Sequence, residues 1–176
     1  SKDVGIEIEH VDIEAMEELE RSGKRVVPSP SVLRIIKDKG LQKQFYRDHG
    51  IPTTDFALID GPGAIADHTD LLPAFLKART GGYDGRGVMA IGSPDDAAKA
   101  FSGASVLEVR ADIALELAVL VVISDNGSHV VYDPVEMVFD PRYNLVDHLR
   151  APARVETGTT REAQDLALRV ARAFGA

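Results

Sequence analysis

The sequence contains no cysteine among its 176 residues, which excludes disulfide bonds, a cysteine nucleophile and thiolate metal ligands within it. It also lacks any apolar run near the roughly 20 residues that a membrane-spanning helix requires. Lysine and arginine number 20 against 28 acidic residues, and the net charge of −8 argues against a nucleic-acid-binding surface. The five histidines show no i, i+4 spacing of the kind that helical metal ligands often have. We therefore expect a cytoplasmic globular protein that binds neither nucleic acid nor membranes.

The pattern of apolar residues predicts an α/β chain in which strands and helices alternate. Strands are expected at residues 4–9, 25–27, 56–59, 72–76, 88–91, 106–109, 115–123 and 130–138. Helices are expected at residues 13–22, 30–37, 39–49, 93–101 and 160–174. Asp12 and Asp38 precede two of these helices as N-caps, and residues 125–127, Asp-Asn-Gly, predict a hairpin turn.

Residues 77–88, Lys-Ala-Arg-Thr-Gly-Gly-Tyr-Asp-Gly-Arg-Gly-Val, form the segment with the most chemical information. They lie between two apolar runs, so the glycines are expected in a strand-loop-strand hairpin. Glycines allow positive φ and let backbone N–H groups approach an anion, while Lys77, Arg79 and Arg86 would supply positive charge. Walker loops and dinucleotide fingerprints both open a helix after their glycines, which this segment does not. From spacing alone, a glycine-rich hairpin turn with solvated cations explains the segment equally well.

The segment 79–87 resembles the glycine-rich loop of 5-(carboxyamino)imidazole ribonucleotide synthetases, which are ATP-grasp ligases of purine biosynthesis. Other segments are similar to that family in order and spacing, namely residues 7–11, 28–30, 35–43, 106–108, 116–119, 134–137 and 151–153. The resemblance implies a ligase that uses ATP and Mg²⁺ to carboxylate 5-aminoimidazole ribonucleotide with bicarbonate, through carboxyphosphate. A homodimer is a further expectation.

The resemblance also implies a domain organisation, with an α/β (α+β) fold that corresponds to the central portion of an ATP-grasp protein. Residues 1–27 would be the last βα unit of a Rossmann-like N-terminal domain. Residues 28–107 would be the ATP-grasp N-terminal subdomain with its glycine-rich lid, and residues 108–176 the start of the C-terminal subdomain. We expect an internal segment of a longer polypeptide that is inactive alone, with the magnesium ligands outside it.

Two groups of residues would bind the ATP phosphates by this resemblance. Lys39 and Lys77 would supply cations, with Lys77 and Arg86 in catalytic roles. The loop that closes over the triphosphate would consist of Gly82, Tyr83, Asp84, Gly85, Arg86, Gly87 and Val88. From the pattern alone, Lys37, Lys39 and Lys43 could instead share one solvated helix face.

The nucleoside would be bound by a second set of residues. Backbone groups of Glu108, Val109, Arg110 and Ala111 would meet the adenine edge. Glu116 would accept hydrogen bonds from the ribose hydroxyls, although its alternation with apolar neighbours also fits an outward strand residue.

Three further glutamates each fit more than one role. Glu136 could line the nucleotide cleft, bind metal, or be the polar face of a strand. Glu7 and Glu9 could face bicarbonate and the aminoimidazole, or be an ordinary exposed strand face.

The sequence departs from the family at three places. Ile123 stands where members commonly have an arginine, Asp133 replaces a tyrosine before a proline, and Phe139 stands where some members have a histidine. Two alternatives therefore stay open. One is another ATP-grasp ligase that joins a different acid and amine, and the other is a non-catalytic nucleotide-binding module.

Overall fold

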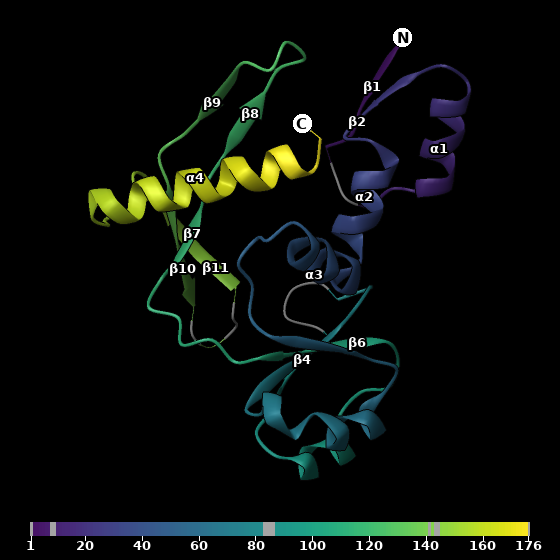
Figure 1. The fold of residues 1–176 in the computed structure, drawn as a ribbon, viewed down its shortest axis with the longest axis vertical. Helices are drawn as coiled ribbons and strands as arrows, with labels where there is room; N and C mark the ends of the chain where they lie inside the picture. Colours follow the sequence, from purple (N-terminus) through teal and green to yellow (C-terminus); the bar gives the residue numbers. More distant parts are fainter. Residues whose placement is uncertain (1, 8–9, 83–86, 141, 143–144, 176) are drawn as a thin grey trace. The chain divides into compact units, whose positions relative to one another are not determined.

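The computed structural model describes residues 2–7, 10–82, 87–140, 142 and 145–175. These residues fold into two compact units (Figure 1). The first unit is formed by the chain up to residue 48 with residues 53–82 and 87–109. The second unit is formed by residues 49–52 and the described residues from 110 onward.

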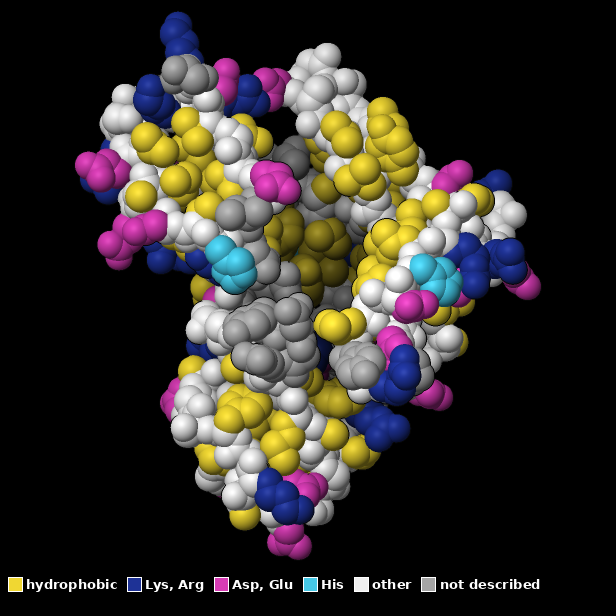
Figure 2. Space-filling view, turned by 180° about the vertical axis from the view of Figure 1, so that it is seen from behind, with side chains coloured by type: hydrophobic (Ala, Val, Ile, Leu, Met, Phe, Trp, Pro, Cys, Tyr) yellow, Lys and Arg dark blue, Asp and Glu magenta, His cyan; other side chains and the backbone are white. Residues whose placement is uncertain are grey.

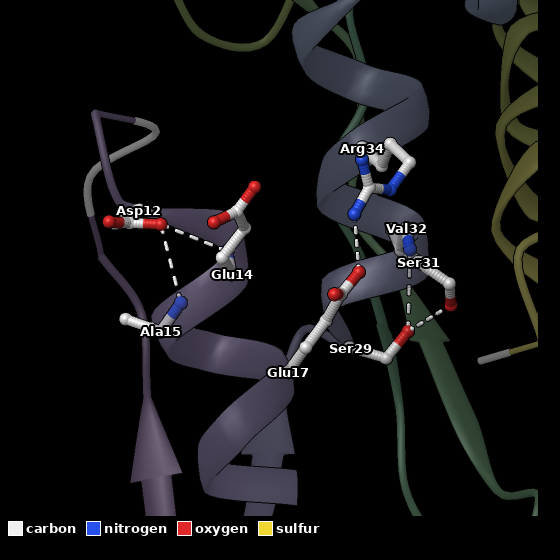
Figure 3. A network of polar contacts seen from close by, with 8 residues as sticks. All are labelled: Asp12, Glu14, Ala15, Glu17, Ser29, Ser31, Val32 and Arg34. Carbon is white, nitrogen blue, oxygen red and sulfur yellow. Dashed lines mark hydrogen bonds and ion pairs between the residues drawn. The ribbon is translucent and has the colours of Figure 1, made fainter.

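The first unit begins with a parallel βαβ element. Strand β1 (Asp3–Gly5) pairs with β2 (Arg25–Val27), and helix α1 (Ile13–Arg21) connects them. The strand expected at residues 4–9 is shorter than predicted and ends at Gly5, with Glu7 exposed beyond it. The predicted N-cap of α1 is confirmed, because the Asp12 carboxylate accepts hydrogen bonds from two amides of the first turn at 2.9 and 3.3 Å (Figure 3).

Two short helices follow, α2 (Pro30–Lys37) and α3 (Lys39–Asp48). The Ser29 hydroxyl accepts a hydrogen bond from the Val32 amide at 3.4 Å, and an ion pair between Glu17 and Arg34 joins α1 to α2 (Figure 3). Asp38 separates the two helices and caps α3, as its sequence position predicts.

A four-stranded antiparallel sheet forms the centre of the first unit. Its strands are β3 (Phe56–Ile59), β6 (Ser105–Val109), β4 (Ala74–Ala78) and β5 (Val88–Ile91), in that spatial order. Two 3₁₀-helices belong to the same unit, η1 (Pro62–Leu71) and η2 (Pro94–Lys99). The helix predicted from residue 93 is therefore a 3₁₀-helix. Helix η1 was not predicted, because it starts among turn residues and contains a non-helical residue, His68.

The two faces of this sheet differ in chemistry. One face packs with η1 into an apolar core of Ile59, Ile65, Ala74, Leu76, Ile91 and Leu107, each no more than 3% exposed. Side chains alternate along a strand, so the opposite face carries Phe56, Phe75, Lys77 and Glu108. Figure 1 shows the 3₁₀-helices on one side of β4 and β6 and α3 on the other side. The polar face of the sheet is therefore the one that α3 approaches.

The second unit contains an antiparallel sheet of β7 (Glu116–Ala118), β10 (Val135–Asp140) and β11 (Leu145–Arg150), in the order β11-β10-β7. Strands β8 (Val121–Ile123) and β9 (His129–Val131) form the predicted hairpin, and α4 (Thr157–Ala173) closes the unit. The strands predicted at 115–123 and 130–138 are each divided. The second division falls at Pro134, which has no N–H to donate to a ladder. Strand β11 was not predicted.

Figure 2 shows acidic and basic side chains interspersed over the visible face, with apolar side chains among them. Within the described residues, no helix has the length and apolar character needed to cross a lipid bilayer.

Candidate functional site

A buried carboxylate held by two lysines lies on the polar face of the first unit's sheet. Glu108 on β6 is only 7% exposed. It lies opposite Phe75 on β4, so Lys77, two residues further along β4, points to the same face and forms an ion pair with it. Lys43 reaches the same carboxylate from α3, with its Nζ 2.6 Å from Oε2. The sheet register and the position of α3 thus bring three charged side chains together.

The two lysines are held very differently. The Lys43 ammonium also donates to the hydroxyls of Thr53 and Thr54 at 2.7 and 2.8 Å, so its three donors all have partners. It lies 5.7 Å from the centre of the Phe56 ring, close enough for a cation–π contact. Lys77 bonds to Glu108 alone among the described residues, and 31% of its side chain is exposed, against 14% for Lys43. Lys77 is therefore the one that an incoming ligand can reach.

The charge state of Glu108 follows from these neighbours. Burial alone would raise the pKa of Glu108, but the hydrogen bonds and charges of Lys43 and Lys77 outweigh burial and lower its pKa. Glu108 is thus a carboxylate at neutral pH. One anion beside two cations leaves this face of the sheet with a net positive charge, which favours an anionic ligand.

The predicted strand-loop-strand hairpin is confirmed for its strands. Lys77 on β4 lies opposite Val88 on β5, and the Ala78 amide donates to the Gly87 carbonyl at 2.8 Å. Gly87 has φ +74°, and a Cβ there would lie 3.2 Å from the Ala78 Cβ, so this position requires glycine. Gly81 and Gly82 lie at the start of the loop, while Tyr83, Asp84, Gly85 and Arg86 lie outside the described residues.

A second ion pair joins the start of this loop to α3. The Arg79 guanidinium donates to both oxygens of Asp38, from Nε at 2.8 Å and from Nη2 at 2.6 Å. Asp38 also accepts hydrogen bonds from the amides of Gly40 and Leu41, at 2.8 and 3.2 Å. Burial would raise the pKa of Asp38, but Arg79 and these amides lower it.

The backbone reinforces the same junction. The Lys39 amide donates to the Arg79 carbonyl at 2.9 Å, and the Arg79 amide donates to the Ala104 carbonyl at 3.1 Å. A Cβ on Gly40 would lie 2.6 Å from the Arg79 Nε, so Arg79 packs directly over this glycine. The N-terminus of α3 and the start of the loop are therefore held in one fixed arrangement.

The structure places the other predicted site residues as follows. Lys39 is the first residue of α3, and its half-buried side chain has no hydrogen bond or ion pair with any other described residue. Val109 ends β6, with its amide 2.9 Å from the Asp55 carbonyl. The second unit contains Arg110, Ala111 and Glu116, of which the first two are exposed and Glu116 is half-buried on β7 opposite Met137.

Glu136 is bound to an arginine in the second unit. The Arg150 Nη1 donates to both Glu136 oxygens, at 2.9 and 2.8 Å. In the described part of the chain, no group of three or more histidines, cysteines, aspartates or glutamates could hold a metal ion. Glu9 lies outside the described residues.

The three positions that the sequence resemblance marks as departures, Ile123, Asp133 and Phe139, lie in the second unit. Ile123 ends β8, Asp133 is exposed just before β10, and Phe139 lies at a register shift between β10 and β11. No hydrogen bond or ion pair involves any of these three side chains in the described part of the chain.

The residue that the sequence analysis missed is Lys43. The idea that Lys37, Lys39 and Lys43 share a solvated face is wrong, because Lys37 donates to the Val11 carbonyl at 2.6 Å and Lys43 bonds to Glu108. A signal for this was present in the spacing of Gly40, Lys43 and Arg47. Residues three and four apart lie on the same helix face. On this face of α3, Gly40 packs against Arg79, and Lys43 and Arg47 lie over the Phe56 ring.

Comparison with known proteins assigns the chain to a family. A model described as the ATP-grasp domain matches residues 44–176. The chain belongs to the ATP-grasp family. The fold agrees, since a solved carboxyaminoimidazole ribonucleotide synthase from Aspergillus clavatus, complexed with ATP, superposes with a TM-score of 0.86 at 32% identity. This match covers 98% of the present chain and 46% of the other. The α/β ATP-grasp fold predicted from the sequence is thus confirmed.

Two named relatives are similar to almost the whole of this chain. The phosphoribosylaminoimidazole carboxylase of Ogataea methanolica is 33% identical over 96% of this chain, and the match covers 32% of that protein. The N5-carboxyaminoimidazole ribonucleotide synthase of Synechocystis is 32% identical over 95% of this chain and 42% of its own length. The Aspergillus clavatus enzyme was also solved with ADP and 5-aminoimidazole ribonucleotide, at 30% identity, a TM-score of 0.85 and coverage of 98% and 46%. The chain therefore spans about a third to under half of these relatives.

Proposed function

We propose that this protein uses ATP to carboxylate 5-aminoimidazole ribonucleotide with bicarbonate, producing N5-carboxyaminoimidazole ribonucleotide, ADP and phosphate. The observation that carries the proposal is the pairing of Lys77 with a buried Glu108 at the base of a glycine-rich hairpin, on a sheet face that carries net positive charge. The ATP-grasp membership of the chain and the names of its relatives support the same reaction.

The phosphates would be bound by cations and backbone amides of the first unit. In this proposal Lys77 exchanges its bond to Glu108 for the nucleotide phosphates, and Lys39 supplies a second ammonium from the start of α3. The loop from Gly82 to Val88 would cover the phosphates, with Arg86 neutralising the charge that develops during phosphoryl transfer.

The nucleoside would be bound by the residues that follow. Backbone groups from Glu108 to Ala111 would meet the adenine, and Glu116 would accept from the ribose hydroxyls. Magnesium is part of the proposal, and since no group of three or more histidines, cysteines, aspartates or glutamates among the described residues could hold it, its ligands are expected elsewhere.

The chemistry would proceed through carboxyphosphate, which forms when an oxygen of bicarbonate attacks the terminal phosphorus of ATP and ADP leaves with the bridging oxygen. The amine of the aminoimidazole would then attack the activated carbon, and phosphate would leave. Such an intermediate reacts with water, so the site must exclude water while it holds several negative charges.

We also propose that the protein is a cytoplasmic homodimer. In its domain organisation, residues 1–27 would be the end of a Rossmann-like domain, and residues 28–107 and 108–176 would be two ATP-grasp portions.

The test is ATP titration of the full-length polypeptide by calorimetry, together with ADP release in the presence and absence of each co-substrate. Lys77→Met should weaken ATP binding by about 10- to 100-fold, because a hydrogen bond between charged groups is lost. Lys99→Met is the matched control, since Lys99 is 75% exposed and should leave binding unchanged.

The outcomes separate the alternatives. ADP release that needs both bicarbonate and 5-aminoimidazole ribonucleotide supports the proposal. ADP release that needs a different acid or amine would favour another ATP-grasp ligase, and ATP binding without turnover would favour a non-catalytic module. Absence of ATP binding would overturn the proposal altogether.

A further inference from the structure

We infer that Lys43 is a positioning residue whose role is to hold Glu108 when Lys77 leaves it for the nucleotide. The inference rests on the proposed function, because it assumes that Lys77 binds the ATP phosphates. It explains why one buried carboxylate has two lysine partners.

The first argument is the unequal fixation of the two lysines. Lys43 is tied by the Thr53 and Thr54 hydroxyls and by the Phe56 ring, and its ammonium has no free donor for another ligand. Lys77 is tied to Glu108 alone among the described residues and is the more exposed of the two. When an anion arrives, Lys77 can therefore change partner, whereas Lys43 stays.

The second argument is what else faces the Glu108 carboxylate. Strand β3 presents the uncharged Phe56 opposite it, and β4 presents Phe75 and Lys77. From α3, Arg47 lies over the Phe56 ring at 5.4 Å, and its Nε is 3.8 Å from the Asp48 carboxylate. In the described part of the chain, Lys43 and Lys77 are the only cations paired with Glu108.

Since Lys77 can change partner and Lys43 is the other cation paired with Glu108, the effect of removing Lys43 can be derived. A buried carboxylate that loses its last cation either takes up a proton or prevents the loss. In a Lys43→Met variant, ATP would draw Lys77 away from its only carboxylate partner, and Glu108 would bind a proton as ATP binds. With Lys43 present, Glu108 stays ionised and no proton is taken up by it.

Proton uptake gives the experiment its readout. Titrations of ATP into the purified full-length polypeptide are carried out by calorimetry in buffers of different ionisation enthalpy, from about pH 6 to about pH 8. Lys43→Met should weaken ATP binding by about 10- to 100-fold. Its affinity should fall further as pH rises, because the proton that Glu108 needs becomes scarcer, while wild-type binding should show no such slope from Glu108.

Three other variants complete the design. Lys43→Met combined with Glu108→Gln should abolish the added pH slope, since no carboxylate is left to protonate. Thr54→Val, which keeps the side-chain shape and removes one hydroxyl that holds Lys43, should give a weaker effect of the same kind and serves if Lys43→Met does not fold. Lys99→Met is again the surface control.

The outcomes distinguish a failure of the proposed function from a failure of the inference about Lys43. If wild-type protein does not bind ATP, both the proposed function and this inference fall. If wild-type protein binds ATP and Lys43→Met binds it with equal affinity, or more weakly but without proton uptake, only the inference falls. Should Lys43→Met fail to fold, an unchanged affinity and pH profile in Thr54→Val would overturn the inference.

Discussion

The two units differ in how their sheets are buried. In the first unit, one face of the sheet contributes five side chains that are no more than 3% exposed to the apolar core, and the other face holds the Glu108 cluster. In the second unit, none of the described residues of β7, β10, β11 or α4 is fully buried, and β11 is exposed until Arg150. The second sheet also holds a glutamate and a cation, Glu136 and Arg150, but Arg150 is 36% exposed on its side chain.

The difference shows what a buried charge cluster requires. The Glu108 side chain is 10% exposed and has two cationic partners, of which Lys43 is held by further contacts. The Glu136 side chain is 17% exposed and has one cationic partner, Arg150, and an ion pair nearer the solvent contributes less. The same residue types are therefore expected to contribute different amounts to the free energy of unfolding in the two units, and substitutions can measure the difference.

The largest difference is expected in the cores. Leu107→Ala removes a side chain that is 0% exposed and should lower the free energy of unfolding by about 3 kcal/mol. Leu149→Ala in the second unit removes one that is 61% exposed and should change it by less than about 0.5 kcal/mol. Denaturant unfolding measures both, and equal losses would contradict the difference in burial.

The second-largest difference in the free energy of unfolding is expected between substitutions of the two paired glutamates, Glu108 and Glu136. Glu108→Gln should lower the free energy of unfolding at neutral pH by about 2 kcal/mol, because it leaves two lysines without a charged partner. Glu136→Gln should lower it by about 0.5 kcal/mol. Similar values for the two variants would mean that burial does not set the strength of these pairs.

The effect of Glu108 should also depend on pH. Its pKa in the folded protein is below the ordinary value of 4.5, so its stabilisation is fully present above that value and is lost as pH falls through the folded pKa. The stability gap between wild type and Glu108→Gln should therefore be constant near neutral pH and narrow in acid. A gap that widened in acid would contradict the lowered pKa.

Two glycines at equivalent helix positions provide a matched pair of smaller effects. Gly40 and Gly158 are each the second residue of their helix, α3 and α4. A methyl group on Gly40 would meet the Arg79 Nε at 2.6 Å, whereas one on Gly158 would meet nothing within 4 Å. Gly40→Ala should therefore disturb the Asp38 pair and cost about 1 kcal/mol, while Gly158→Ala should stabilise by about 0.5 kcal/mol. Thermal unfolding of both variants tests the contrast, which disappears if Arg79 moves aside freely.

The smallest effect concerns the start of α4. Glu156 has the extended backbone of an N-cap, but its side chain makes no cap hydrogen bond, unlike Asp12 and Asp38 in the first unit. Glu156→Asp should supply the missing bond and raise the free energy of unfolding by about 0.5 kcal/mol. Asp12→Ala, expected to lose a similar amount, is the opposite control, and the idea fails if Glu156→Asp has no effect.

Local signals predicted the parts of the fold that local chemistry determines. Helix α3 was predicted to within one residue, because Asp38 caps it and Gly50 follows its end. The hairpin at residues 125–127 was likewise predicted from its turn residues, and Gly127 has the positive φ, +81°, that such a turn needs. The division of the later strands depends instead on which strand pairs with which, and no local pattern contains that information.

The candidate site shows the same limit. Lys77 and the loop could be recognised because they stand next to each other in the sequence. Lys43 could not, since its identity as a partner of Glu108 depends on how α3 packs against a strand more than 60 residues later. Strand β11 was missed because its apolar residues, Leu145, Val146 and Leu149, are exposed and do not alternate regularly with polar ones.

The order of strands in the first sheet has a consequence for how this chain is made. Strand β6 lies between β3 and β4, yet it is the last of the four strands in the sequence. During synthesis β3 and β4 emerge without the strand that joins them, and their unpaired edges stay open until residue 109 has been added. Such non-local pairing slows folding. Since Glu108 belongs to this late strand, the lysines acquire their carboxylate only when the sheet is complete.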